Sequence, residues 1–248
     1  MTIFVAAMKN NDDIFREFQE SLENMKGHFH VLESSVPVER QMEYFHYSED
    51  VKKQSEGRSI EGEISELHSL ESSINDKKFA MTYLAVSGDV KAFRELEAYS
   101  KTAEPELNDW IQMSLLQAKI ILESEFSDEK QVFISTGLGG HERKLRFFSF
   151  FKSNELKPFS PYQIQLIKKE IPFHIKKYGG QVEELEVFDN YFTVLYLIDL
   201  SVNIKNMMEE ALNECNQYGD FISRSFIITN VKKYTEEEIR NELERKNE

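Results

Sequence analysis

The stretch Gln131–Lys152, QVFISTGLGGHERKLRFFSFFK, consists of two strand-like runs joined by a glycine-bearing loop. Its second run packs four phenylalanines into five positions, namely Phe147, Phe148, Phe150 and Phe151. Successive side chains of a strand point to opposite faces, so both faces of this strand carry large apolar groups. Strands of that kind are covered on both sides in folded proteins. We therefore expect this strand to lie within a sheet that is buried on both faces.

The residues after this strand alternate between strand and helix patterns. Apolar residues recur with a period of 2 in strands and about 3.6 in helices, so the order of elements can be deduced from the sequence. The expected elements are strand 144–152, helix 162–177, strand 182–188, strand 191–200, helix 203–218 and strand 221–231. A final charged helix should begin at Thr235, because Glu238 follows it at the spacing of a capping box.

Counted from Lys144, this β-α-β-β-α-β order resembles that of ferredoxin-like domains. The resemblance implies a four-stranded antiparallel sheet with two helices on one side. Strand 131–136 should form an extra N-terminal strand that pairs with the first strand as a hairpin. The second face of the sheet then needs cover from the N-terminal helices or a partner subunit, because several exposed phenylalanines would invite association.

Helical patterns dominate the residues before this sheet. Helices are expected over 11–26, 60–75, 77–86, 89–100 and 105–123, and the polar segment 48–63 is expected as an exposed connection, either a linker or a solvated helix. Within residues 77–124, the run SGDVKAFRELEAYSKTAEPELNDWIQMSLLQAKIIL resembles a HEAT repeat, in which a Gly-Asp opening precedes one helix and an acidic-Pro turn separates it from a second. That resemblance implies an interaction scaffold.

Together these patterns predict an α+β protein with two domains. The first is an α-helical, HEAT-like domain over residues 1–126. The second is a ferredoxin-like antiparallel sheet with an extra N-terminal strand and a C-terminal helix, over residues 131–248.

The composition limits the classes of function. With 248 residues, 40% apolar content and a formal charge of −14, the chain can build a sizeable core and stay soluble. An acidic chain argues against binding a phosphate backbone, so nucleic acid is not expected as a partner. The single cysteine, Cys215, fits a reducing compartment. The sequence shows neither a signal peptide nor a run of about 18 apolar residues, so we expect a cytoplasmic protein without membrane contact.

The glycine-bearing loop is a candidate binding site for a small ligand or a phosphate. Glycines let backbone N–H groups approach an anion, and the candidate residues are Gly139, Gly140, His141 and Arg143. The spacing matches neither the dinucleotide-binding nor the P-loop pattern, and the loop leads into a strand instead of a helix. A wide hairpin turn is the favoured interpretation of the same glycines.

Other reactive side chains do not combine into a site. His28 and His30 lack further metal ligands nearby in the sequence, so no metal and no cofactor are predicted. Cys215 lies in an amphipathic helix and is expected to be an inert packing residue. Glu184 and Glu186 share one face of their strand, as on a solvent-facing edge strand. No catalytic residue is assigned.

The β-α-β-β-α-β order also looks like an RNA-recognition motif, which stacks bases on aromatic residues of its central strands. Phe148, Phe150, Phe192 and Tyr196 would then form the stacking surface. The acidic strand 182–188 and the overall charge weigh against this alternative. Core packing is the favoured interpretation of the same four aromatic residues, and they are also the candidates for an interaction surface with a protein.

The favoured prediction of function follows from the absence of an assembled catalytic set and from the excess of strands with apolar groups on both faces. It is a non-catalytic cytoplasmic protein-interaction or regulatory module, whose partner is an unknown protein or a second copy of the chain. A ligand site in the glycine loop and RNA binding through the sheet remain alternatives, and an enzyme is disfavoured.

Overall fold

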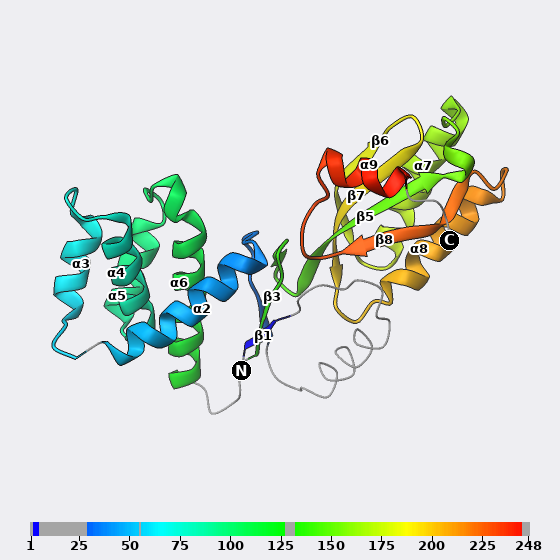
Figure 1. Ribbon diagram of the computed structural model, residues 1–248. Coiled ribbons are helices and arrows are strands. Elements are labelled where there is room, and N and C mark those ends of the chain that lie inside the picture. The colour runs from blue at the N-terminus through cyan, green and yellow to red at the C-terminus, as the bar shows by residue number, and fades with distance from the viewer. Residues whose placement is uncertain (1, 5–28, 55, 127–131, 245–248) are drawn as a thin grey trace. The chain divides into compact units, whose positions relative to one another are not determined.

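The computed structural model describes residues 2–4, 29–54, 56–126 and 132–244 (Figure 1). The described residues divide into two compact units, one formed by residues 2–4 with 29–135 and the other by residues 136–244. The fold is α+β, with a helical region followed by an antiparallel sheet. The predicted boundary between residues 126 and 131 lies a few residues earlier than the observed division after Ser135. The predicted helix 11–26 lies outside the described residues.

The first unit is built mainly from helices. They are α2 (Val38–Lys53), α3 (Ile60–His68), α4 (Ile74–Val86), α5 (Val90–Tyr99), the short η1 (Pro105–Leu107) and α6 (Asn108–Phe126). Polar side chains begin three of them as the capping rules predict. Ser59 accepts from the backbone N–H of Gly62, Ser73 forms a capping box with Asp76, and Asp89 accepts from Ala92.

Aromatic residues form the centre of this helical core. Trp110 is 4% exposed and donates its indole N–H to the Thr82 hydroxyl at 3.0 Å. The Tyr44 ring meets the Trp110 ring edge to face, with centroids 5.2 Å apart. Among residues on the predicted apolar faces, Leu84 and Leu96 are buried, whereas Val90 is 45% exposed. The helical prediction for residues 77–123 is thus confirmed in its elements.

The polar segment 48–63 is mostly exposed, as predicted, and it is helical at both ends. α2 extends to Lys53 and α3 begins at Ile60, so only residues 54–59 connect the two helices. Glu63 is 4% exposed and receives a 2.7 Å hydrogen bond from Arg58, which neutralises its charge on burial. The single helix expected over 60–75 is divided at Ser69, because α4 has its own capping box at Ser73.

Three short parallel strands complete the first unit. They are β1 (Thr2–Phe4), β2 (Phe29–Val31) and β3 (Val132–Ser135), in the order β1-β3-β2. Strand β3 was expected to form a hairpin with the strand at 144, and that pairing is not observed. Instead, the Ser135 hydroxyl donates to Gln41 of α2 at 2.7 Å, and the hairpin partner is the two-residue β4 (Gly140–His141).

The second unit contains an antiparallel sheet with a central strand β5 (Lys144–Ser153). Its other elements are η2 (Asn154–Leu156), α7 (Pro161–Lys177), β6 (Gln181–Val187), β7 (Tyr191–Asp199), α8 (Ile204–Asn216), β8 (Ile222–Thr229) and α9 (Glu236–Glu244). β5 pairs with β7 on one side and with β8 and β4 on the other, and β6 pairs with β7. The predicted order of strands and helices after Lys144 is confirmed, with boundaries shifted by one or two residues.

The sheet has two differently covered faces. The face that we call the helix face carries Phe147, Phe151, Phe192 and Tyr196, each at most 1% exposed. Helices α7 and α8 pack against each other and against β6 and β8. The opposite face, which we call the pocket face, carries Phe148, Phe150, Tyr191, Thr193 and Leu195. Helix α9 packs there through Ile239 and Leu243 (Figure 1).

Both faces of β5 are therefore buried, as its sequence predicts. The cover on the second face is a helix of the same unit, whereas the N-terminal helices or a partner subunit were expected there. Among the described residues, none of the helices is both long and apolar enough to cross a membrane.

Candidate functional site

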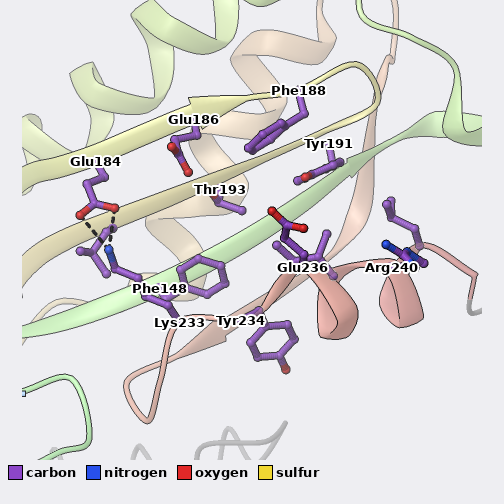
Figure 2. Close-up of a pocket in the computed structure, with 13 residues that line it drawn as sticks. Phe148, Glu184, Glu186, Phe188, Tyr191, Thr193, Lys233, Tyr234, Glu236 and Arg240 are labelled. Carbon is purple, nitrogen blue, oxygen red and sulfur yellow. Dashed lines mark hydrogen bonds and ion pairs between the residues drawn. The ribbon is translucent and has the colours of Figure 1, made fainter. Parts of the chain in front are cut away.

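A cavity of about 560 Å³ lies on the pocket face, between the strands and helix α9 (Figure 2). Its walls combine aromatic rings, three carboxylates and two cations. The lining residues are Phe148, Glu184, Glu186, Phe188, Tyr191, Thr193, Leu195, Lys233, Tyr234, Glu236, Ile239, Arg240 and Leu243. Pockets of roughly 300–1,000 Å³ with an apolar lining and a few polar groups are typical of small-molecule and cofactor sites.

Regular pairing from the hairpin turn places two of the carboxylates in this cavity, because Glu186 pairs with Thr193 and Glu184 with Leu195. The register shifts between Val182, which pairs with Tyr196, and Glu184, which pairs with Leu195. The extra residue lets Val182 face the helices while Glu184 and Glu186 face the cavity. Without this β-bulge, strict alternation from Glu184 would turn Val182 toward the pocket face instead.

The residue within the bulge fixes the neighbouring loop. Glu183 accepts two hydrogen bonds from Arg146, from Nε at 2.5 Å and from a terminal nitrogen at 2.9 Å. The same guanidinium donates to the carbonyl oxygen of Leu138 at 2.7 Å. The Glu183 carboxylate raises the pKa of Arg146, so the guanidinium stays charged. This network joins β5, β6 and the glycine loop at one end of the cavity.

Aromatic rings form the apolar walls. Phe188 and Tyr191 stack with centroids 4.4 Å apart and an angle of 16° between planes. Their backbones also meet, because the Phe188 N–H donates to the Tyr191 carbonyl at 2.9 Å. On the other side, Phe148 stacks on Tyr234 with centroids 5.7 Å apart. Phe188 is 42% exposed, so one ring of the first pair remains open to solvent.

Helix α9 forms the remaining wall, and its start is fixed locally. Thr235 and Glu238 form the capping box that the sequence predicts: the Glu238 N–H donates to the Thr235 hydroxyl, and the Thr235 N–H donates back to the Glu238 carboxylate. Lys233, just before the helix, donates to both oxygens of Glu184 at 2.7 and 2.6 Å. Ile239 then anchors the helix in the apolar cluster of the pocket face.

The charges in the cavity are only partly paired. Lys233 is occupied by Glu184, and Figure 2 draws that ion pair between the cavity residues. Outside the backbone hydrogen bonds of β6 and α9, no hydrogen bond or ion pair of the described residues involves the side chain of Glu186, Glu236 or Arg240. Burial raises the pKa of Tyr191, and the nearby Glu236 and Glu186 carboxylates raise it further. The cavity therefore offers hydrogen-bond acceptors and one guanidinium beside an aromatic stack.

The glycine loop lies outside this cavity and forms a turn. The Gly139 N–H donates to Thr136, and the Gly139 carbonyl accepts from the Arg146 N–H. Gly140 pairs with Leu145 in β4, and both Gly139 and Gly140 are buried. His141 ends β4 and Arg143 lies in the two-residue turn that leads into β5, and both are exposed. The backbone geometry follows the turn interpretation of these glycines.

The four aromatic residues of the predicted interaction surface do not share a face. Phe148 and Phe150 are on the pocket face and are 4% and 2% exposed. Phe192 and Tyr196 are on the helix face and are fully buried. Only Phe148 lines the cavity.

Several cavity residues were not identified from the sequence. Tyr191 and Phe188 flank the predicted Asp189-Asn190 turn, and this position in the sequence could have indicated that their rings lie close together. Glu236 and Arg240 lie one turn apart on the predicted last helix, which places them on one face. Their approach to Glu186 depends on where α9 packs, which no local pattern shows.

The other reactive side chains remain apart from the cavity. Cys215 is fully buried, and burial raises the pKa of its thiol to about 12, which keeps the sulfur protonated. Among the residues that the structure describes, no three His, Cys, Asp or Glu side chains gather as a metal site. His28 lies outside the described residues, so the His28–His30 pair is not placed.

No protein-family model and no curated protein matches the chain. Among solved structures, it is similar to a protein of Deinococcus radiodurans R1 assigned as a transposase, at 15% identity and a TM-score of 0.36, over 41% of this chain and 89% of that chain. It is also similar to a REP-associated tyrosine transposase bound to a REP hairpin, at 9% identity and a TM-score of 0.31. That second similarity covers 39% of this chain and 61% of the transposase, so the chain spans about three fifths of that protein's length.

Two predictions are corrected at this point. The similar solved structures are transposases, one of them bound to a REP hairpin, so neither a non-catalytic protein-interaction module nor the exclusion of nucleic acid is retained. The structure also removes one reason for the first prediction, because α9 of the same unit covers the apolar face for which the N-terminal helices or a partner subunit were expected. The prediction that excluded nucleic acid rested on the net charge of the whole chain. A net charge does not give the local chemistry of the aromatic cavity.

Proposed function

We propose that the cavity beneath α9 binds an unstacked base of a single-stranded nucleic acid. The observation that carries the proposal is the stacked pair of Phe188 and Tyr191, open to solvent on one side and bordered by uncommitted hydrogen-bonding groups. Base–aromatic stacking contributes about 1–3 kcal/mol per base and tolerates any base, because every base has a π-face.

The size and openness of the cavity suit a base that remains attached to its strand. A volume of about 560 Å³ exceeds what one planar ring system fills, which leaves room for the sugar. The lining residues Phe188, Glu236 and Arg240 are exposed. The sugar-phosphate backbone can therefore stay in solvent on either side of the bound base.

The acidic character of the chain fits a contact centred on the base. A protein that neutralises many phosphates loses affinity steeply as salt rises, because bound counterions are released. Here the cavity supplies Lys233 and Arg240, and Lys233 is already paired with Glu184. Binding through stacking predicts a shallow dependence on salt.

The test is fluorescence anisotropy with the full chain and a labelled single-stranded DNA 12-mer of mixed sequence, alongside the duplex of the same sequence. We expect the single strand to bind and the duplex to bind at least about tenfold more weakly, because paired bases cannot enter the cavity. Phe188→Ala should weaken single-strand binding about tenfold through lost stacking. Phe173→Ala is the matched control, since Phe173 is 59% exposed on α7 and does not line the cavity.

Three outcomes would overturn the proposal. The first is the absence of single-strand binding, and the second is an equal loss of binding in the Phe188 and Phe173 variants. The third is that free nucleosides compete with the strand and bind with the same affinity as the strand. The last result would identify a small-molecule site instead of a site for a strand.

We also propose the finer description of the two units. The strand order β6-β7-β5-β8 with antiparallel neighbours supports a ferredoxin-like arrangement for the second unit, in which β4 adds a short extra pairing. The succession of α4, α5 and α6 with a proline turn between the last two supports a HEAT-like element in the first.

A further inference from the structure

We infer that the cavity selects guanine, with Glu236 and Arg240 as the residues that determine the specificity. The inference rests on the proposed binding of a base and adds which base the cavity prefers. Both residues line the cavity from α9, and Figure 2 shows the Glu236 carboxylate pointing toward Tyr191.

The two side chains are available to a ligand. Glu236 and Arg240 have the four-residue spacing at which a glutamate and an arginine commonly pair on a helix. No ion pair between them is formed in the structure, although both are exposed and line the same cavity. An acceptor group and a donor group therefore stand one helical turn apart, each with open hydrogen-bonding capacity.

Guanine matches this pair of groups. An ionised carboxylate only accepts hydrogen bonds, and a guanidinium only donates them. Guanine presents two adjacent donors, N1–H and the 2-amino group, and on its neighbouring edge two acceptors, O6 and N7. Glu236 can accept from the first edge while Arg240 donates to the second, with the ring stacked on the aromatic wall.

The other bases match less well. Adenine and cytosine each offer one amino group on the edge that would face Glu236. Thymine offers one N–H between two carbonyl oxygens, which would face the carboxylates of Glu236 and Glu186. Carboxylates cannot donate to those oxygens, so thymine should bind most weakly.

The test compares single-stranded 11-mers of thymidine that carry one central guanine, inosine, 7-deazaguanine or thymine. We expect the guanine strand to bind about tenfold more tightly than the all-thymine strand. Inosine lacks the 2-amino group and 7-deazaguanine lacks N7, so each should lose part of that advantage. Glu236→Gln should abolish the difference between guanine and inosine, and Arg240→Gln the difference between guanine and 7-deazaguanine.

Glu237→Gln is the control variant, because Glu237 is exposed on the same helix turn and does not line the cavity. It should keep the full preference for guanine. Equal affinity for all four strands, with binding intact and sensitive to Phe188→Ala, would overturn guanine selection alone. Absence of binding to every strand would overturn the proposed function itself.

Discussion

Gly137 lies so close to Val231 that a β-carbon at Gly137 would stand 1.8 Å from the Val231 carbonyl oxygen. The obstacle is backbone, which cannot rotate away as a side chain can. Next to it, the Leu138 N–H donates to the Asn230 carbonyl at 3.0 Å, so the loop before β5 is bound to the chain that follows β8.

Gly137→Ala should therefore destabilise the second unit by at least about 1–3 kcal/mol, because the loop or the end of β8 must move. Gly62→Ala in α3 is the matched control. Its β-carbon would meet only the Ser59 hydroxyl at 3.1 Å, and alanine favours helix. Urea denaturation of both variants measures the difference, and equal stability of the two would contradict the assigned contact.

The stacked rings on the helix face should dominate the stability of the sheet. Phe151 is fully buried and stacks on Phe192 with centroids 4.6 Å apart. Phe151→Ala should cost about 3–5 kcal/mol through lost burial and a residual cavity. Phe173→Ala, at a ring that is 59% exposed, should change the free energy of unfolding by less than about 1 kcal/mol. Thermal and urea unfolding monitored by far-UV circular dichroism tests both values.

The helical unit contains an ion pair with a predictable dependence on pH. Lys77 is 7% exposed and donates to Glu104, and Tyr99 donates to the same carboxylate. Hydrogen bonds from Lys77 and then Tyr99 lower the pKa of Glu104 to about 2. Because this pKa lies below its ordinary value, the stabilisation is complete above about pH 4.5 and is lost as pH falls toward 2.

Glu104→Gln should destabilise the protein at pH 7 by about 1–2 kcal/mol, since it leaves the buried Lys77 ammonium without its partner. The value is smaller than for a fully buried pair, because the Glu104 side chain is 42% exposed and solvent screens it. The difference from the wild type should shrink as pH falls below about 4.5. Glu106→Gln, two residues away and exposed, is the control, and a pH-independent difference at Glu104 would argue against the ion pair.

The pKa of the Tyr191 phenol in the cavity wall should respond to the charge of the neighbouring carboxylates. Burial raises the pKa of Tyr191 first, and the Glu236 carboxylate adds to this because a negative charge disfavours the phenolate. Glu236→Gln should therefore lower the pKa of Tyr191, whereas Glu237→Gln should leave it unchanged. Carbon-13 resonances of labelled tyrosine rings, followed through an alkaline titration, measure both. Identical titrations in the two variants would place Glu236 away from Tyr191.

The sequence predicts those features of the fold that depend on neighbours along the chain. The Asp189-Asn190 turn, the helix behind Ser160-Pro161 and the capping box at Thr235 are all formed, because a few adjacent residues determine each. Strand β5 is buried on both faces for the same reason, since its phenylalanines alone require it.

Features that depend on cross-strand register were not predictable in this way. Alternation separates Phe148 from Phe147 within β5, but it cannot say that Tyr191, and not Phe192, shares the face of Phe148. The bulge beside Glu183 is equally invisible in the sequence, although it decides which face of the sheet Val182 joins. The cavity combines such register effects with the packing of α9, and that is why its residues were missed.

The middle position of β3 affects the order in which the first unit can be completed during synthesis. β1 and β2 are made first, yet they cannot pair with each other, because β3 lies between them. Helices α2 to α6 leave the ribosome before β3 does. The residues of β1 and β2 therefore lack their pairing strand until Val132–Ser135 has been synthesised. A nascent chain that stalls before Val132 would thus present two unpaired strands to any neighbouring polypeptide.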